Sequence, residues 1–313
     1  MTLAILCSGQ GLQHDQMFAL IGDAPEAGPL FARATTLLGG HDPREMVRGD
    51  TADAVHRNRA AQILCTLNAL AATAALRDAW PDRRIIAGYS VGEIAAWSIA
   101  GWAESTITLD LVAQRAEAMD AVSEHGDGLL FVSGLSLRSV EHLCRRHDAA
   151  IAIINPGDAF ILGGSGVALD SLASEAKAIG AARIVRLTVN VASHTPRLAG
   201  ASSEFRKLLD QIPTKTKFDA GVRLFSGTDG TPVFDIPTGL NKLAKQISQT
   251  VHWADCLEAC MEAGASTFFE LGPGRALTEM VTNAYPGTHA RSLEDFRTLQ
   301  GVRAWIAGLP ESN

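Results

Sequence analysis

The sequence is poor in several features that mark whole classes of protein. Its 313 residues include only five cysteines, an odd number, with no C-x-x-C pair and no histidine at zinc-finger spacing. Reduced thiols in a reducing compartment are therefore expected, rather than a disulfide framework or a metal site. Basic residues are in deficit, because 27 lysines and arginines face 34 aspartates and glutamates, for a net charge of −7. This balance provides no cationic field for a polyanion and speaks against nucleic acid and anionic membranes as partners.

Long apolar runs are also missing. Residues 3–7 are apolar but too few for a secretion signal, and no basic residue precedes them. The longest apolar stretch, 60–76, is interrupted by four polar side chains that lipid would leave without partners, namely Gln62, Thr66, Asn68 and Thr73. We therefore expect a buried helix there, no membrane span and a cytoplasmic protein.

Apolar residues still make up 47% of the chain, enough for a large core, and their pattern predicts alternating strands and helices. The first part reads as strands over 3–7 and 84–88, with helices over 60–80, 94–100 and 106–122. The last part reads as strands over 222–226 and 266–270, with helices over 197–209, 239–248, 254–263, 276–284 and 296–307. This order is typical of a large α/β-hydrolase-like domain with a mainly parallel sheet.

The middle of the chain has a different order. It reads as strand 128–133, helix 137–146, strands 150–154 and 160–163, helix 167–179 and strand 183–189. The β-α-β-β-α-β order is that of a ferredoxin-like unit, which buries two helices on one face of its own sheet. The sequence therefore predicts a large α/β domain from 1–125 and 191–313, with a ferredoxin-like subdomain inserted at 126–190.

One motif indicates nucleophilic chemistry. Gly88-Tyr89-Ser90-Val91-Gly92 is a G-x-S-x-G placed between a predicted buried strand and a predicted helix. In a nucleophile elbow the small neighbours allow a strained turn, which leaves the serine hydroxyl exposed at a helix N-terminus. The Val91 N–H would then point toward an oxyanion, and the helix dipole would favour negative charge. An ordinary turn serine is the alternative.

A catalytic serine needs a base, and His194 is the candidate among nine histidines. It lies where the chain leaves the predicted insert and returns to the large domain, whereas several others stand in polar runs. A solvated loop histidine is the alternative. Arg115 lies on the predicted helix 106–122. It can extend to water or pair with Glu117 or Asp120 on its own helix, or it can form a buried bidentate pair with another carboxylate. Gly9-Gln10-Gly11 lacks the further glycine and the lysine of nucleotide-binding loops.

Together these residues resemble the malonyl-CoA:acyl-carrier-protein transacylases, which share their fold with the acyltransferase domains of fatty acid and polyketide synthases. The resemblance covers nearly the whole chain, in five motifs that occur in the family's order: Gly9-Gln10-Gly11-Leu12-Gln13, Gly88-Tyr89-Ser90-Val91-Gly92-Glu93, Gln114-Arg115, Ser193-His194 and Glu270-Leu271-Gly272-Pro273-Gly274.

The resemblance implies a role for each of these side chains. Ser90 is the nucleophile, His194 its base, and the N–H groups of Gln10 and Val91 form the oxyanion hole. Arg115 holds the free carboxylate of a malonyl group, so malonyl-CoA is the expected donor and an acyl carrier protein the expected acceptor. No cofactor and no metal are implied.

Two glutamines follow from the same resemblance. In the family a main-chain carbonyl, rather than an acid, orients the histidine, and this carbonyl falls at Gln246 here. Gln62 falls where the family has a glutamine in the substrate pocket.

Three departures from the family pattern lie beside these positions. Tyr89 replaces the usual histidine before the serine, Cys7-Ser8 the usual Phe-Pro, and Ile63 the usual proline. With its elbow running into Ala95-Ala96-Trp97, and with Ser193-His194-Thr195-Pro196, the chain resembles most the epsilon subunit of malonate decarboxylases. That resemblance implies loading of the decarboxylase's carrier subunit, whose thiol belongs to a phosphoribosyl-dephospho-CoA arm.

Two alternatives remain at this point. The first is a malonyl-CoA:acyl-carrier-protein transacylase of fatty acid synthesis. The second is a serine esterase or thioesterase of the α/β-hydrolase type, which would need an acidic partner for its histidine. The chain between serine and histidine offers three such acids, namely Asp110, Asp127 and Asp158.

Overall fold

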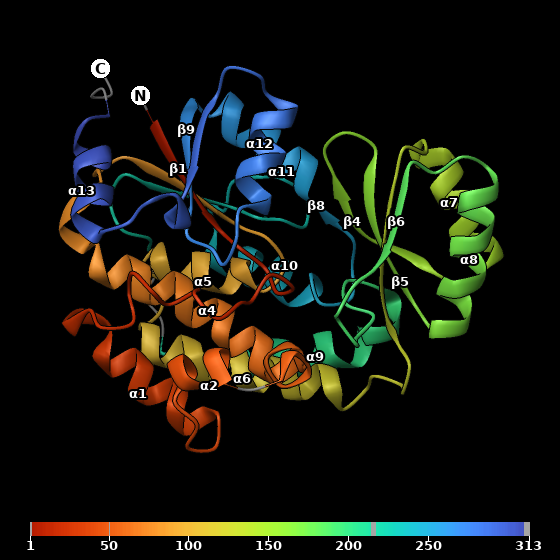
Figure 1. Cartoon of the computed structure of the whole chain (residues 1–313), viewed down its shortest axis with the longest axis horizontal. Helices are drawn as coiled ribbons and strands as arrows, with labels where there is room; N and C mark the ends of the chain where they lie inside the picture. The colour runs from red at the N-terminus through yellow and green to blue at the C-terminus, as the bar shows by residue number, and fades with distance from the viewer. Residues whose placement is uncertain (1, 50, 214–216, 310–313) are drawn as a thin grey trace.

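A computed structural model describes residues 2–49, 51–213 and 217–309, arranged around two separate sheets (Figure 1). The larger part of the molecule holds a five-stranded sheet in the order β10-β9-β1-β2-β7, in which every neighbouring pair is parallel. Its strands are β1 (Thr2–Cys7), β2 (Arg84–Gly88), β7 (Val222–Phe225), β9 (Ala265–Glu270) and β10 (His289–Ser292). The α/β class with a mainly parallel sheet is confirmed.

Helices cover both faces of this sheet because its central strands are apolar on both sides. In β1, Leu3 and Ile5 face the core shared with α4 (Asn58–Ala75) and α5 (Gly92–Ile99). Ala4 and Leu6 face the opposite core, which is shared with α11 (Trp253–Glu262) and α12 (Ala276–Ala284). The remaining helices of this part are α1 (Gly28–Leu37), α2 (Pro43–Gly49), α3 (Ala52–His56), α6 (Ser105–Asp120), α9 (Ala199–Leu209), α10 (Ile236–Lys245) and α13 (Leu299–Ala307).

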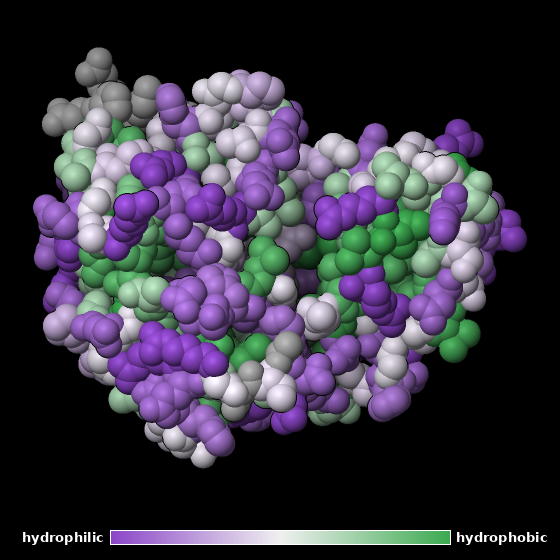
Figure 2. Space-filling model, in the orientation of Figure 1, coloured by the Kyte–Doolittle hydropathy of each residue, from purple (hydrophilic) through white to green (hydrophobic). Residues whose placement is uncertain are grey.

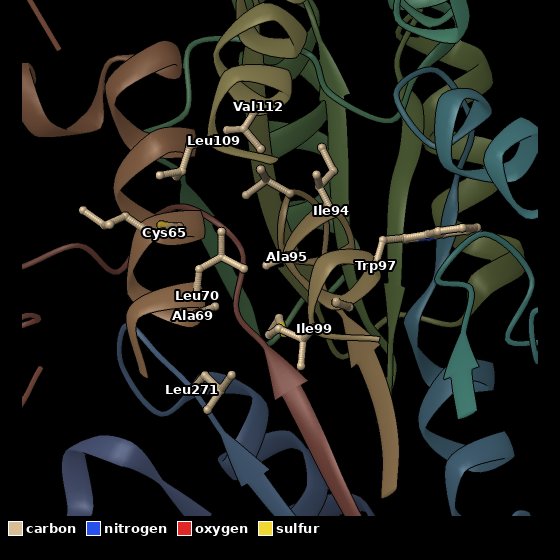
Figure 3. Packing of buried hydrophobic residues seen from close by; sticks show 14 of the residues in the cluster. Cys65, Ala69, Leu70, Ile94, Ala95, Trp97, Ile99, Leu109, Val112 and Leu271 are labelled. Atoms are coloured by element: carbon tan, nitrogen blue, oxygen red, sulfur yellow. The ribbon is translucent and has the colours of Figure 1, made fainter. Parts of the chain in front are cut away.

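Helix α4 packs against α5 and α6 and is buried along most of its length. Figure 3 shows Cys65 and Leu70 of α4 directed toward Ile94 of α5 and Leu109 of α6. Each of these side chains is at most 2% exposed, and full burial of such a side chain contributes roughly 1.5–3 kcal/mol. This packing fixes the position of α4, and with it the buried polar side chains that α4 carries, such as Gln62.

The second sheet is mainly antiparallel, in the order β6-β3-β5-β4-β8. Four of its strands come from residues 126–190, namely β3 (Gly128–Ser133), β4 (Ala150–Asn155), β5 (Ala159–Gly164) and β6 (Arg183–Arg186). Helices α7 (Leu137–Arg146) and α8 (Gly166–Ala178) pack on its outer face, on the right in Figure 1. Its other face carries Leu129, Ile153 and Ile161, which belong to the same core as α11 and α12.

Several element predictions from the sequence were wrong in detail. The helix predicted over 60–80 ends at Ala75 and is followed by a short 3-10 turn at Arg77–Ala79. Trp80 is extended, as expected for a residue before a proline. The short strand β8 (Val251–His252) pairs in parallel with β4 and was not predicted, nor were β10 and helices α1 to α3. The last helix begins at Leu299, where the Thr298 side chain accepts from the Gly301 N–H, and not at 296.

None of the helices in the described ranges is long and apolar enough to cross a bilayer. Across the same residues, no three His, Cys, Asp or Glu side chains are grouped so that they could hold a metal ion.

Candidate active site

The elbow around Ser90 depends on two glycines. Ser90 has φ +55°, a conformation that costs a non-glycine residue on the order of 1–3 kcal/mol. A Cβ at Gly88 would lie 2.2 Å from the backbone nitrogen of Glu93, and one at Gly92 would lie 2.2 Å from the Cys7 carbonyl oxygen. The strand β2 and the helix α5 can therefore approach closely enough to hold Ser90 at the tip of a sharp turn.

His194 meets this serine from a segment 104 residues later in the chain. Its Nε2 lies 2.7 Å from Ser90 Oγ, and its Nδ1 lies 2.6 Å from the carbonyl oxygen of Gln246. Its backbone N–H donates to Ile247 O at 2.8 Å, so both the ring and the main chain are fixed. A carbonyl can only accept, which assigns the proton to Nδ1 and leaves Nε2 free to accept from the serine hydroxyl.

The surroundings keep the imidazole neutral. Burial, with Arg115 nearby as a second cause, lowers the pKa of His194 to about 3, and the bond to the Gln246 carbonyl opposes this only in part. The histidine is 1% exposed, so the solvated-loop alternative is wrong. A neutral ring beside a serine hydroxyl is the arrangement that general-base activation requires.

Arg115 is buried behind the elbow on α6, and its guanidinium has only neutral partners. One terminal nitrogen donates to Gln62 Oε1 at 2.6 Å and the other to Gln246 Oε1 at 3.2 Å, while Nε has no partner among the described residues. Burial lowers the pKa of Arg115 to about 10, so it is still a cation at neutral pH. The nearby charge of Glu93 opposes this shift, but no carboxylate bonds to the guanidinium. A buried cation with only neutral hydrogen-bond partners is costly, and an incoming carboxylate would relieve that cost.

The acidic partners considered for Arg115 are engaged elsewhere. Glu117 pairs with Arg59, and Asp120 accepts from the Asn58 side chain. With 1% exposure the arginine does not extend to water either. The two structural alternatives for Arg115 are therefore wrong.

Gln246 connects these groups to one another. Its carbonyl faces His194 and its side-chain oxygen faces Arg115, as described above. Its side-chain nitrogen donates to the Ser90 carbonyl at 2.9 Å and to Glu93 Oε2 at 2.7 Å. No role was predicted for Glu93 from the sequence. It directly follows Gly92 of the elbow and lies in the first turn of α5.

The loop at residues 9–11 lies against the elbow. The Tyr89 N–H donates to the Cys7 carbonyl at 2.9 Å, and a Cβ at Gly9 would lie 2.9 Å from the Tyr89 carbonyl. Gln10 therefore lies beside Ser90, and Val91 directly follows it at the N-terminus of α5. The two residues predicted to donate to an oxyanion are thus next to the serine, at the positive end of a helix dipole.

A cavity of about 210 Å³ opens onto Ser90 and His194. It lies between the two sheets, where Figure 2 shows a hollow with apolar surface beside it. Its apolar walls come from both parts of the chain: Leu12, Leu129, Ile153, Ile161, Leu187, Val189, Leu277 and Met280. Arg115 and Gln62 do not line it, so they lie one layer deeper than the serine and the histidine.

Comparison with known proteins places the chain in a family. No family model matches it. A malonyl CoA-acyl carrier protein transacylase of Haemophilus influenzae is 24% identical over 97% of this chain and 98% of its own. The corresponding protein of Mycobacterium bovis is 30% identical over 67% of this chain and 68% of its own. The chain belongs to the malonyl-CoA–acyl-carrier-protein transacylase family.

Solved structures agree with this assignment. An acyl-carrier-protein S-malonyltransferase of Burkholderia pseudomallei superposes with a TM-score of 0.88 at 24% identity, over 97% of this chain and all of that one. The MCAT of Mycobacterium tuberculosis superposes with a TM-score of 0.88 at 26% identity, over 98% of this chain and all of that one. This family member is therefore an acyltransferase, and the family resemblance found in the sequence is confirmed.

The three departures from the family pattern can now be located. Ser8 lines the cavity and donates to Glu270 Oε1 at 2.7 Å. Tyr89 also lines it, with its ring packed edge-on against Trp253 at 5.3 Å between centroids. Ile63 is fully buried in α4, next to Gln62. Two of the three departures therefore shape the wall of the cavity and one shapes the helix behind it.

Proposed function

We propose that this protein moves a malonyl group from malonyl-CoA to the thiol of an acyl carrier protein through an ester on Ser90. One observation carries the proposal, namely a Ser90–His194 pair joined through Gln246 to a buried arginine that lacks a carboxylate partner. The names of the relatives support the same donor and acceptor. One solved structure shows a malonyl-transacylase in complex with a type II polyketide acyl-carrier protein, and this chain is 23% identical to the transacylase. This complex supports the carrier as acceptor.

In the first half-reaction Ser90 Oγ attacks the thioester carbon while His194 Nε2 takes the hydroxyl proton. The N–H groups of Gln10 and Val91 receive the negative charge that forms on the carbonyl oxygen. The carbon–sulfur bond then breaks, and His194 returns the proton to the departing CoA sulfur. The malonyl group is left as an ester of Ser90.

The second half-reaction reverses these steps with a different thiol. His194 takes the proton of the carrier thiol, whose sulfur attacks the ester carbonyl. The bond to Ser90 Oγ breaks and the serine recovers the proton from His194. The scheme predicts ping-pong kinetics.

Arg115 selects the acyl group. A malonyl carboxylate that reaches the guanidinium replaces the neutral oxygen of Gln62 or Gln246 with a charged acceptor. An acetyl group offers no such acceptor, so the buried cation would stay poorly matched. Charge-assisted bonds of this kind contribute about 1.5–3 kcal/mol each, which favours malonyl over acetyl donors.

A hydrolase of the α/β-hydrolase type is the less supported alternative. The side chain of an acid would have to face His194 Nδ1, where the Gln246 carbonyl lies. Of the acids considered, Asp110 pairs with Arg33 and Asp127 with Arg197. A carbonyl partner favours the transferase.

Two carriers are candidate acceptors. The relatives named as acyl-carrier-protein transacylases favour a carrier of fatty acid synthesis with a phosphopantetheine arm. The cavity-lining departures Ser8 and Tyr89 favour the carrier subunit of a malonate decarboxylase, with its phosphoribosyl-dephospho-CoA arm. The second assignment stays a prediction that rests on the departures from the family pattern and on the resemblance of the neighbouring sequence.

Intact-protein mass spectrometry after incubation with malonyl-CoA tests the proposal. Wild type should gain one malonyl group, mapped to Ser90 by fragmentation, and Ser90→Ala should gain none. A labelled Ser90→Ala protein, or release of free malonate without an acceptor, would contradict it. Adding each purified carrier in turn and comparing kcat/KM then decides between the two acceptors.

A further inference from the structure

The buried carboxylate of Glu93 has no function in the scheme above, yet it lies at the centre of the site. It is fully buried in the first turn of α5 and accepts from Gln246 Nε2 at 2.7 Å and from the Gly227 N–H at 3.2 Å. It touches none of the atoms that react. Burial of a charge at this depth is expensive unless its partners compensate.

Glu93 controls how the Gln246 side chain is oriented. A primary amide has one accepting end and one donating end. The donating end of Gln246 faces Glu93 and the Ser90 carbonyl, so its accepting end faces Arg115. An ionised carboxylate accepts only, and therefore holds the amide in this orientation. A protonated carboxyl group holds it less firmly, because its carbonyl oxygen carries less negative charge and is a weaker acceptor than a carboxylate oxygen.

We propose that Glu93 is a positioning residue for malonyl transfer, and that its ionised form acts through Gln246 to align Ser90 and His194 with Arg115. The inference rests on the proposed function and adds a residue to it. Gln246 is suited to transmit the effect because its own carbonyl holds His194 Nδ1. Without the hydrogen bond to Glu93, the Gln246 side chain would be free to turn, and both His194 and Arg115 would be less firmly positioned.

The protonation state of Glu93 can change near neutral pH. Burial raises its pKa to about 7, against the opposing hydrogen bonds from Gln246 and Gly227. The charged and titratable groups that face it from the elements packed around it are Arg115 on α6, Asp229 after β7 and Cys256 on α11, with His194 beyond Gln246. Of these groups Arg115 favours the ionised form of Glu93, and Asp229 opposes it.

The pH dependence separates this role from a structural one. Serine activation in wild type should rise as the pH rises through about 7, because ionised Glu93 is the active form. A rise caused by His194, whose pKa burial lowers to about 3, would persist when Glu93 is replaced, so the variant separates the two groups. Glu93→Gln keeps the shape of the side chain and resembles the protonated form at every pH. The ratio of wild-type to variant rate should therefore grow from near one at pH 5.5 to roughly tenfold at pH 8.5, the loss expected for a hydrogen bond to a buried charge.

The test uses two reagents on the full-length protein. Malonyl-CoA loading of Ser90 is followed by mass spectrometry, and inactivation by phenylmethylsulfonyl fluoride is followed in parallel across pH 5.5–8.5. The sulfonyl reagent forms its bond with Ser90 Oγ, releases fluoride and needs no malonyl-CoA, so it reports alignment of the serine and histidine even if the proposed donor is wrong. Failure of malonyl loading with a pH-dependent inactivation ratio would overturn the proposed function alone.

Asp127→Asn is the matched control, because Asp127 is also a buried carboxylate but pairs with Arg197 and does not line the cavity. Its rate ratio to wild type should not change with pH. A Glu93→Gln ratio that is equally flat, or a wild-type rise near pH 7 that persists in Glu93→Gln, would overturn the inference. Thermal denaturation of each variant gives the folded fraction by which the rates are corrected.

Discussion

Replacing Arg115 with alanine should separate recognition of the acyl group from the chemistry on Ser90. The guanidinium contacts neither reacting side chain directly, since its partners are Gln62 Oε1 and Gln246 Oε1. A malonyl carboxylate held by two charge-assisted hydrogen bonds gains about 3–4 kcal/mol, allowing for the neutral bonds that it replaces. Loss of that gain lowers kcat/KM for malonyl-CoA roughly 100- to 1,000-fold, at 1.4 kcal/mol per tenfold.

Acetyl-CoA provides the internal reference for this experiment. An acetyl group has no carboxylate to lose, so its transfer should change by less than about fivefold, and the ratio of the two donors cancels any loss of folded protein. Arg59→Ala, on the neighbouring helix α4 and paired with Glu117 at the surface, should leave the ratio unchanged. Equal falls for malonyl-CoA and acetyl-CoA in Arg115→Ala would mean that the arginine only supports the fold.

Two further predictions concern stability. Gly92→Ala places a Cβ within 2.2 Å of the Cys7 carbonyl oxygen, so the strand and the elbow must move apart, and we expect a fall in Tm together with loss of Ser90 labelling; normal labelling of a folded Gly92→Ala protein would contradict the account of the elbow. Glu93 has a pKa raised from an ordinary 4.5 to about 7 in the folded protein, so the folded state binds more protons than the unfolded state between these values, and wild type loses stability as the pH rises through this window. Glu93→Gln has no carboxylate to titrate and does not lose this stability. In denaturant titrations, the unfolding free energy of Glu93→Gln minus that of wild type should therefore increase by on the order of 2–3 kcal/mol from pH 4.5 to pH 7. A difference that stays constant with pH would contradict the raised pKa of Glu93.

The sequence predicted the parts of the fold that follow from periodicity and missed those that depend on partners. Apolar runs located β1, β2 and β9, and the insert's order of elements was readable because each element packs on its own sheet. β8 is only Val251 and His252, too short for any periodicity, and exists as a strand because β4 offers it a free edge. β10 ends the parallel sheet with a mixed-polarity run of four residues that likewise has no apolar signal.

The candidate site divides along similar lines. Ser90 has a local signal, because strand, tight turn and helix follow one another in the sequence. His194 became a candidate through its place at the end of the predicted insert, and the resemblance to a family supported it. Gln62 and Gln246 have no signal of their own and were named by that resemblance, since their positions depend on segments that meet only in the folded chain. Glu93 was quoted within a motif without a role, because only the structure brings its carboxylate to the Gln246 side chain.

The route of the chain through the site bears on when the protein becomes reactive during its synthesis. Ser90 leaves the ribosome first, His194 follows 104 residues later, and the carbonyl that orients the histidine follows after a further 52. A nascent chain that has completed the elbow therefore carries a serine without a base, and then a histidine without its anchor. Efficient acylation of Ser90 is consequently expected only after the chain as far as Gln246 has been made and has docked, which makes labelling of this serine a reporter of folding as well as of activity.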